Sequence, residues 1–209
     1  MAREFFYDNQ IRRFILQFVR MFSNFQVEIG APDSSGNRDM LTVPVMYGDL
    51  SRNVAQIMRE ASENKVLSAP RMSCYINQLQ YQRERIQEPN FIDKLHVRQR
   101  KYDENTKTYS RTQSNAVTVE RHMPVPYELR MNLDIWTTNT EMKLQLLEQI
   151  LCLFNPDFEI QSTDNYVDWT SLSYVHLENV NFSSRSIPVG TEDQIDIAQL
   201  EFSMPIWLS

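Results

Sequence analysis

The feature that most constrains the fold is an unbroken two-residue alternation in the second half of the chain. Over residues 127–135, Tyr, Leu, Met, Leu and Ile alternate with Glu, Arg, Asn and Asp. Successive side chains of a β-strand point to opposite faces, so the pattern predicts a strand. We expect one of its faces to be buried and the other to meet water or a partner. The core should therefore be built on a sheet.

Two stretches with helical periodicity predict helices that pack on this sheet. Residues 9–23 carry apolar side chains every three or four positions, and Asp8 is the expected N-cap. The segment 138–154, capped by Thr138 or Asn139, is apolar around most of its circumference. We expect this second helix to be buried on more than one side.

Shorter signals supply the remaining elements. Pro44 lies within an alternating run over residues 41–47 and has no N–H to donate, which places that strand at an edge or a bulge. Another strand follows Pro70, and its alternation changes phase near Leu79, which indicates a bulge. Further extended segments are expected at 27–29, 158–160, 172–182 and 200–206, and a short helix after Asp49 or Ser51, over about 54–61.

Residues 82–121 differ from the rest of the chain. They contain nine basic and six acidic residues, a net charge of +3, whereas the whole chain is −6 and the remainder is therefore −9. Residues 103–107 are expected to form the tip of a hairpin between 97–102 and 108–112. A polar stretch this long inside a compact domain is typically functional or disordered. We interpret it as a basic extended arm, which is either a solvated hairpin with no role, a contact between subunits or a contact with DNA.

Together these elements predict one domain over residues 1–209, with 82–121 as an arm inserted in it. The expected fold class is α/β in the α+β sense. A mostly antiparallel or mixed β-sheet is flanked by about three helices and carries a long projecting β-hairpin arm.

Arginine and tyrosine are the residue types that most often carry contacts between proteins, and the arm and the first helix hold several of them. For Arg12 and Arg13 the alternative is a solvated helix face with local ion pairs. The candidate subunit-interface residues are Arg12, Arg13, Arg83, Arg85, Arg98, Arg100, Lys101, Tyr102, Tyr109 and Arg111.

Signals for enzymatic chemistry are missing from the sequence. The four glycines form no phosphate-binding loop, and the three histidines lie far apart and near no cysteine pair. We therefore expect no catalytic residues, no metal and no cofactor. The negative charge argues against a general nucleic-acid binder. Two separated cysteines, Cys74 and Cys152, are expected to be buried free thiols in a cytosolic protein with no signal peptide and no membrane contact.

Several segments, in order along nearly the whole chain, resemble one known family. They are Phe6-Tyr7, Ile11-Arg12-Arg13-Phe14, Phe22-Ser23-Asn24-Phe25-Gln26-Val27, Val43-Pro44-Val45-Met46-Tyr47-Gly48, Pro70-Arg71-Met72, residues 127–151, Phe154-Asn155-Pro156-Asp157-Phe158, and residues 200–207. The family is the tail sheath stabiliser and completion protein of T4-like contractile-tailed bacteriophages. The stretch 82–121 shows little likeness to it.

The resemblance implies a structural virion protein that assembles in the cytoplasm of the host bacterium. It implies a homo-oligomeric ring, expected to be hexameric, at the head-proximal end of the tail. There the ring would cap and stabilise tube and sheath and offer a docking surface for the neck. Sheath, tube or terminator, and neck proteins are the implied partners, and DNA is only cargo in the channel. An acidic channel wall would discourage DNA from sticking.

Two alternatives stay open at this point. One is a tail-tube terminator or baseplate component of the same kind of tail, which differs by the end of the tail that it occupies. The other belongs to a different class and is a cytosolic phage binding module or enzyme, which would bind a small molecule tightly.

Overall fold

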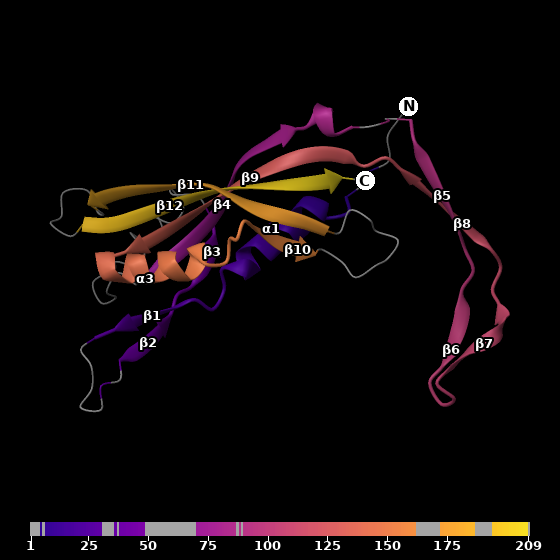
Figure 1. The fold of residues 1–209 in the computed structure, drawn as a ribbon, viewed down its shortest axis with the longest axis horizontal. Helices are drawn as coiled ribbons and strands as arrows, with labels where there is room; N and C mark the ends of the chain where they lie inside the picture. The colour runs from indigo at the N-terminus through magenta and orange to yellow at the C-terminus, as the bar shows by residue number, and fades with distance from the viewer. Residues whose placement is uncertain are drawn as a thin grey trace.

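The computed structural model describes residues 5, 7–30, 36, 38–48, 70–86, 88, 90–161, 172–186 and 194–208. Its centre is a curled six-stranded sheet in the order β10-β11-β12-β9-β4-β3 (Figure 1). All neighbours in it are antiparallel except β3 and β4, so the sheet is mixed and the fold is mostly β. The strands are β3 Val45–Tyr47, β4 Arg71–Tyr81, β9 Val125–Thr137, β10 Asp157–Gln161, β11 Leu172–Ser186 and β12 Gln194–Leu208.

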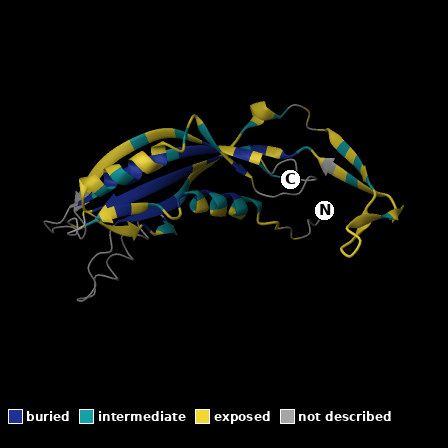
Figure 2. Cartoon of the chain, turned by 60° about the horizontal axis from the view of Figure 1, so that its bottom comes forward, coloured by how far each residue is buried: buried dark blue, intermediate teal, exposed yellow. Residues whose placement is uncertain are grey.

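The core lies between one face of this sheet and two α-helices, α1 (Gln10–Met21) and α3 (Thr140–Leu151). Figure 2 shows the buried residues gathered along the central strands and the inner sides of the helices. Helix α1 buries the apolar stripe expected from its periodicity, with Phe14 and Phe18 in the core. The expected cap is wrong, because Asn9 precedes the helix and the Asp8 carboxylate instead accepts a hydrogen bond from Arg13 at 2.7 Å.

Helix α3 begins as expected, since the Asn139 side chain accepts a hydrogen bond from the Glu141 N–H at 3.0 Å. The expectation that this helix is buried on more than one side is wrong. Leu146, Leu147 and Ile150 face the core, whereas Leu144 and Leu151 are exposed. Cys152, at the helix C-cap, is exposed too, against expectation, and Cys74 is buried.

The described residues hold two α-helices, not three. The short helix expected over about 54–61 lies outside them.

The strand expected at 41–47 is divided at Pro44. The first part, β2 (Asp39–Thr42), pairs with β1 (Gln26–Ile29) in a separate ladder, and the second part, β3, pairs with β4 at the sheet edge. Because proline has no N–H, only its carbonyl is used there, accepting from the Met72 N–H at 2.9 Å. The bulge expected in β4 is confirmed by a register shift between Ile76 and Gln78.

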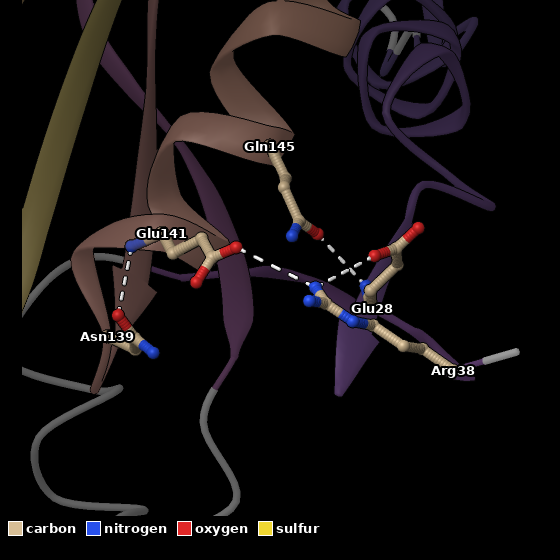
Figure 3. Close-up of polar contacts among 5 residues, drawn as sticks. All are labelled: Glu28, Arg38, Asn139, Glu141 and Gln145. Atoms are coloured by element: carbon tan, nitrogen blue, oxygen red, sulfur yellow. Dashed lines mark hydrogen bonds and ion pairs between the residues drawn. The ribbon is translucent and has the colours of Figure 1, made fainter. Parts of the chain in front are cut away.

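The β1–β2 ladder is attached to α3 by polar contacts (Figure 3). The Glu28 N–H donates to the Gln145 side-chain oxygen at 2.9 Å. Arg38, just before β2, lies 3.2 Å from the Glu28 carboxylate and 3.8 Å from that of Glu141. These ion pairs are exposed, so each contributes little to stability, whereas the hydrogen bond to backbone fixes the position of β1 on the helix.

One half of β9 departs from the expected pattern of one buried and one open face. Asn132 and Asp134, on the face turned away from the helices, are only 5% and 2% exposed. Tyr75 of β4 lies beside them, and its hydroxyl accepts from Asn132 at 3.3 Å and from Gln199 of β12 at 2.7 Å. Burial raises the pKa of Tyr75. The second face is therefore a buried polar layer here, which alternation alone does not distinguish from a wet one.

Residues 92–122 form two further antiparallel ladders, which together we name the 92–122 hairpin. The inner ladder pairs β5 (Ile92–Val97) with β8 (Val117–His122), and the outer one pairs β6 (Arg100–Asp103) with β7 (Thr108–Gln113). The chain enters from β4 through a 3₁₀ turn, η1 (Arg83–Arg85), and returns into β9. Figure 1 shows the hairpin at the end of the molecule opposite to β1 and β2.

Candidate assembly surfaces

The inner ladder of the 92–122 hairpin has one aliphatic face. Leu95 is paired with Val119, and Val97 with Val117, so these four side chains share one side of the two strands. Val117 is 60% exposed, and the other three are half-buried. On the opposite face Lys94 makes an ion pair with Glu120 at 2.9 Å, and the hydrogen bond from Lys94 lowers the pKa of Glu120. An isolated two-stranded ladder is marginally stable in water, so an aliphatic face of this kind gains stability when it is covered.

The outer ladder carries an aromatic pair. Tyr102 and Tyr109 face each other across β6 and β7, with ring centroids 5.0 Å apart and ring planes at 58°. Both are exposed, at 47% and 65%. A hollow of about 510 Å³ runs along this end of the hairpin. It is lined by Lys101, Tyr102, Asp103, Glu104, Thr106, Thr108 and Ser110.

Five cations of the hairpin are exposed and make no ion pair in the part of the chain that the structure describes. Arg98 donates to the Gln113 side-chain oxygen at 3.4 Å, which leaves its charge uncompensated. The other four extend into water from the outer ladder and its turn. The five are Arg98, Arg100, Lys101, Lys107 and Arg111.

The candidate interface residues fall into two places in the structure. Arg83 and Arg85 lie in η1, at the root of the hairpin, and the six candidates at 98–111 lie on it. Arg12 and Arg13 lie on α1 instead. Arg13 is held by the Asp8 carboxylate at 2.7 Å and by the Asp8 carbonyl oxygen at 2.9 Å, the local ion pair of the solvated-face interpretation. Arg12 is exposed.

A second charged surface was missed at the level of sequence. The face of β10, β11 and β12 turned away from the helices carries Glu159, Glu178 and Glu201, which make no ion pair among the described residues. Glu178 accepts from the Ser203 hydroxyl at 2.6 Å and Glu201 from the Asn181 amide at 3.2 Å. The alternation of the sequence did indicate two of these positions. Glu159 lies between the core residues Phe158 and Ile160, and Glu201 lies between Leu200 and Phe202, so both must point to the opposite face.

The same face, which we name the open acidic face, holds exposed apolar side chains. Tyr174 is paired with Glu159, and Leu172 with Gln161, so both point to the same side as the carboxylates. They are 42% and 61% exposed. Beside them His176 contacts Asp157 across the strands at 2.5 Å, and this hydrogen bond raises the pKa of His176. The surface thus combines negative charge with apolar contact area.

No group of three or more His, Cys, Asp or Glu side chains in the described ranges is arranged to hold a metal ion. Among the same residues, no helix has the length and apolar character needed to cross a membrane.

Comparison with known proteins decides the family. The model of the T4-like virus Myoviridae tail sheath stabiliser family matches residues 5–209. The chain belongs to this family. The resemblance inferred from the sequence is confirmed, and the match includes both the sheet and the 92–122 hairpin. A search of curated proteins found no match.

Membership in the tail sheath stabiliser family makes this a structural protein of the virion tail, with sheath and other tail proteins as its partners. The relevant sites in such a protein are surfaces for assembly. Among the residues that the structure describes, the 92–122 hairpin and the open acidic face are two candidates for such surfaces.

Proposed function

We propose that six copies of this protein form a closed ring at the head-proximal end of a contractile phage tail. The ring caps and stabilises tube and sheath and provides the docking surface for the neck, with DNA passing through it only as cargo. The observation that carries the proposal is the family match over residues 5–209. A terminator must close, and head-to-tail contacts that close on rotation give a finite ring, whereas contacts that do not close extend a filament.

The 92–122 hairpin is proposed to be the arm that contacts a neighbouring subunit. Its partly exposed aliphatic face, its exposed tyrosine pair and its five cations without an ion pair among the described residues support this role. Such a surface has the aromatic and arginine content typical of interfaces. The contact residues proposed on it and at its root are Arg83, Arg85, Arg98, Arg100, Lys101, Tyr102, Tyr109 and Arg111, with Arg12 and Arg13 on α1 as a separate contact.

The ring itself is tested on tails. Purified protein is added to tails that were assembled in cells lacking it, and the particles are imaged by negative-stain electron microscopy with a gold label on the protein. We expect label at the head-proximal end and sheaths that stay extended. Label at the baseplate end would instead make the protein a baseplate component, and absence of binding would contradict the proposal altogether.

The arm is tested by a deletion that the structure makes feasible. Ile92 and His122 are paired, so a short Gly-Ser turn can join residues 91 and 123 without moving β4 or β9. We expect the shortened chain to retain its β-sheet circular dichroism and to bind or complete tails poorly. Normal completion of tails by this variant would show that the hairpin is not a subunit contact.

A further inference from the structure

The hairpin and the open acidic face carry opposite net charges. Five cations on the hairpin and three carboxylates on the face, Glu159, Glu178 and Glu201, make no ion pair among the described residues. The exposed carboxylates of Asp103 and Glu104 lie at the turn of the hairpin too, so five cations against two carboxylates leave this end net positive. A surface with a net charge favours a partner of the opposite sign, and charge sets orientation and association rate more than affinity.

Both surfaces also expose apolar side chains that could cover one another. The inner ladder offers Leu95, Val97, Val117 and Val119 on one face. The open acidic face offers Leu172 and Tyr174 beside Glu159. Covering exposed aliphatic and aromatic side chains contributes roughly 25 cal/mol per Å² of apolar area removed from water. Each surface therefore combines an apolar patch with charged side chains, and the charges of the two surfaces are opposite in sign.

Within one copy the two surfaces do not meet. The hairpin leaves the sheet where β4 and β9 end their pairing at Tyr81 and Tyr127. Figure 1 shows it separated from β10, β11 and β12. A second copy of the chain brings its own acidic face to the hairpin of the first.

We propose that the hairpin of each subunit lies on the open acidic face of the next copy, with the aliphatic side of the inner ladder against Leu172 and Tyr174. Its cations then face Glu159, Glu178 and Glu201. The contact is heterologous, because two different surfaces meet, and repeats in one sense around a ring. The inference rests on the ring of the proposed function and names the surfaces that join it.

A charge-swap experiment tests this pairing. One full-length variant carries Arg98→Glu, Arg100→Glu and Arg111→Glu, and a second carries Glu159→Arg, Glu178→Arg and Glu201→Arg. Self-association is measured by sedimentation velocity at low salt, and binding to tails that lack the protein by co-sedimentation. Each variant alone places like charges in the contact, so we expect its association to fall at least ~10-fold.

An equimolar mixture of the two variants is the decisive measurement. In an alternating ring, the reversed hairpin meets the reversed face, and the native hairpin meets the native face. The mixture should therefore restore association to the level of the unchanged protein. A control with Arg20→Glu makes a change of the same sign at an exposed position of α1, away from both surfaces, and should associate normally.

Each other outcome is informative. If both variants fold, as judged by circular dichroism, and the mixture stays unassociated, the proposed pairing is wrong. If the hairpin variant associates normally but loses affinity for double-stranded DNA, the hairpin binds nucleic acid and the proposal is overturned. If the unchanged protein does not bind tails at all, the proposed function itself is wrong. If it binds tails and the charge reversals have no effect on association, only the pairing of these two surfaces is wrong.

Discussion

Phe18 of helix α1 packs edge-on against Phe202 of strand β12, with ring centroids 5.3 Å apart and ring planes at 72°. Phe22 and Phe154 also contact Phe202, at 5.5 and 5.3 Å between centroids. Residues from the first helix, from the segment after α3 and from the last strand thus meet at one ring. This contact joins the two ends of the described chain through the core.

Truncation of Phe202 should therefore destabilise the whole domain. Phe202 is 1% exposed, and Phe202→Ala leaves a cavity among three other rings, so we expect the free energy of unfolding to fall by about 3–5 kcal/mol. Urea denaturation followed by circular dichroism measures it. Phe182→Ala, at a 61% exposed position on β11, is the matched control and should cost below about 1 kcal/mol. Equal losses for both would contradict a core role for this cluster.

The two cysteines should differ sharply in reactivity. Burial, followed by the nearby Asp134 carboxylate, raises the pKa of the Cys74 thiol far above its ordinary value, so the reactive thiolate is scarce. Cys152 is exposed at the C-cap of α3. We expect an aromatic disulfide reagent at pH 8 to label one thiol per folded chain and two in denaturant. Cys152→Ser should leave the folded chain unlabelled; rapid labelling of that variant would contradict the burial of Cys74.

Sequence periodicity was informative where one face of an element meets the core. The stripe of α1, the alternation of β9 and the phase change in β4 each have a direct physical cause, because a single buried face imposes a single period. Pro44 was informative for a different reason, since its missing N–H determines where a ladder stops. The family resemblance was carried by these same core-forming segments.

The features that periodicity did not predict depend on which elements become neighbours in the fold. Leu144 and Leu151 have the same character as Leu146 and Leu147, and only the placement of α3 on the sheet decides which pair is covered. Asn132 and Asp134 look like surface residues until Tyr75 and Gln199 are brought beside them by the strand order. The candidate contacts on the hairpin were found from composition, whereas the open acidic face needed three strands to be aligned before its carboxylates came together.

The pair formed by Lys143 and Asp196 should show the asymmetry of a partly buried ion pair. Lys143 is 8% exposed, with its ammonium 3.2 Å from the Asp196 carboxylate and 5.5 Å from the ring centroid of Phe182. Asp196→Asn leaves this ammonium without its counter-ion, so we expect a loss of about 2 kcal/mol in the free energy of unfolding. Lys143→Met removes the charge and keeps the apolar stem, and should cost less.

The pH dependence of the same pair has a definite sign. The hydrogen bond from Thr140 at 2.6 Å, followed by the contact with Lys143, lowers the pKa of Asp196. Its stabilising contribution is therefore present above the ordinary Asp value of about 4 and is lost as the pH falls through the lowered one. Urea titrations of the unchanged protein and of Asp196→Asn should converge towards low pH. If Lys143→Met lowers the free energy of unfolding more than Asp196→Asn does, the cost does not come from an ammonium left without its counter-ion.

The contact between His176 and Asp157 predicts a titration of opposite sign. The hydrogen bond to Asp157 raises the pKa of His176, and the nearby Glu178 carboxylate acts in the same direction. Stabilisation by the charged imidazole is therefore complete below the ordinary His value of about 6.5 and is lost as the pH rises through the raised one. We expect NMR titration of the His176 ring to show this raised pKa, and Asp157→Asn to return it towards 6.5. Glu159→Gln removes a neighbouring carboxylate of β10 and should leave it nearly unchanged, whereas a raised pKa that persists in Asp157→Asn would show that the cross-strand hydrogen bond is not its cause.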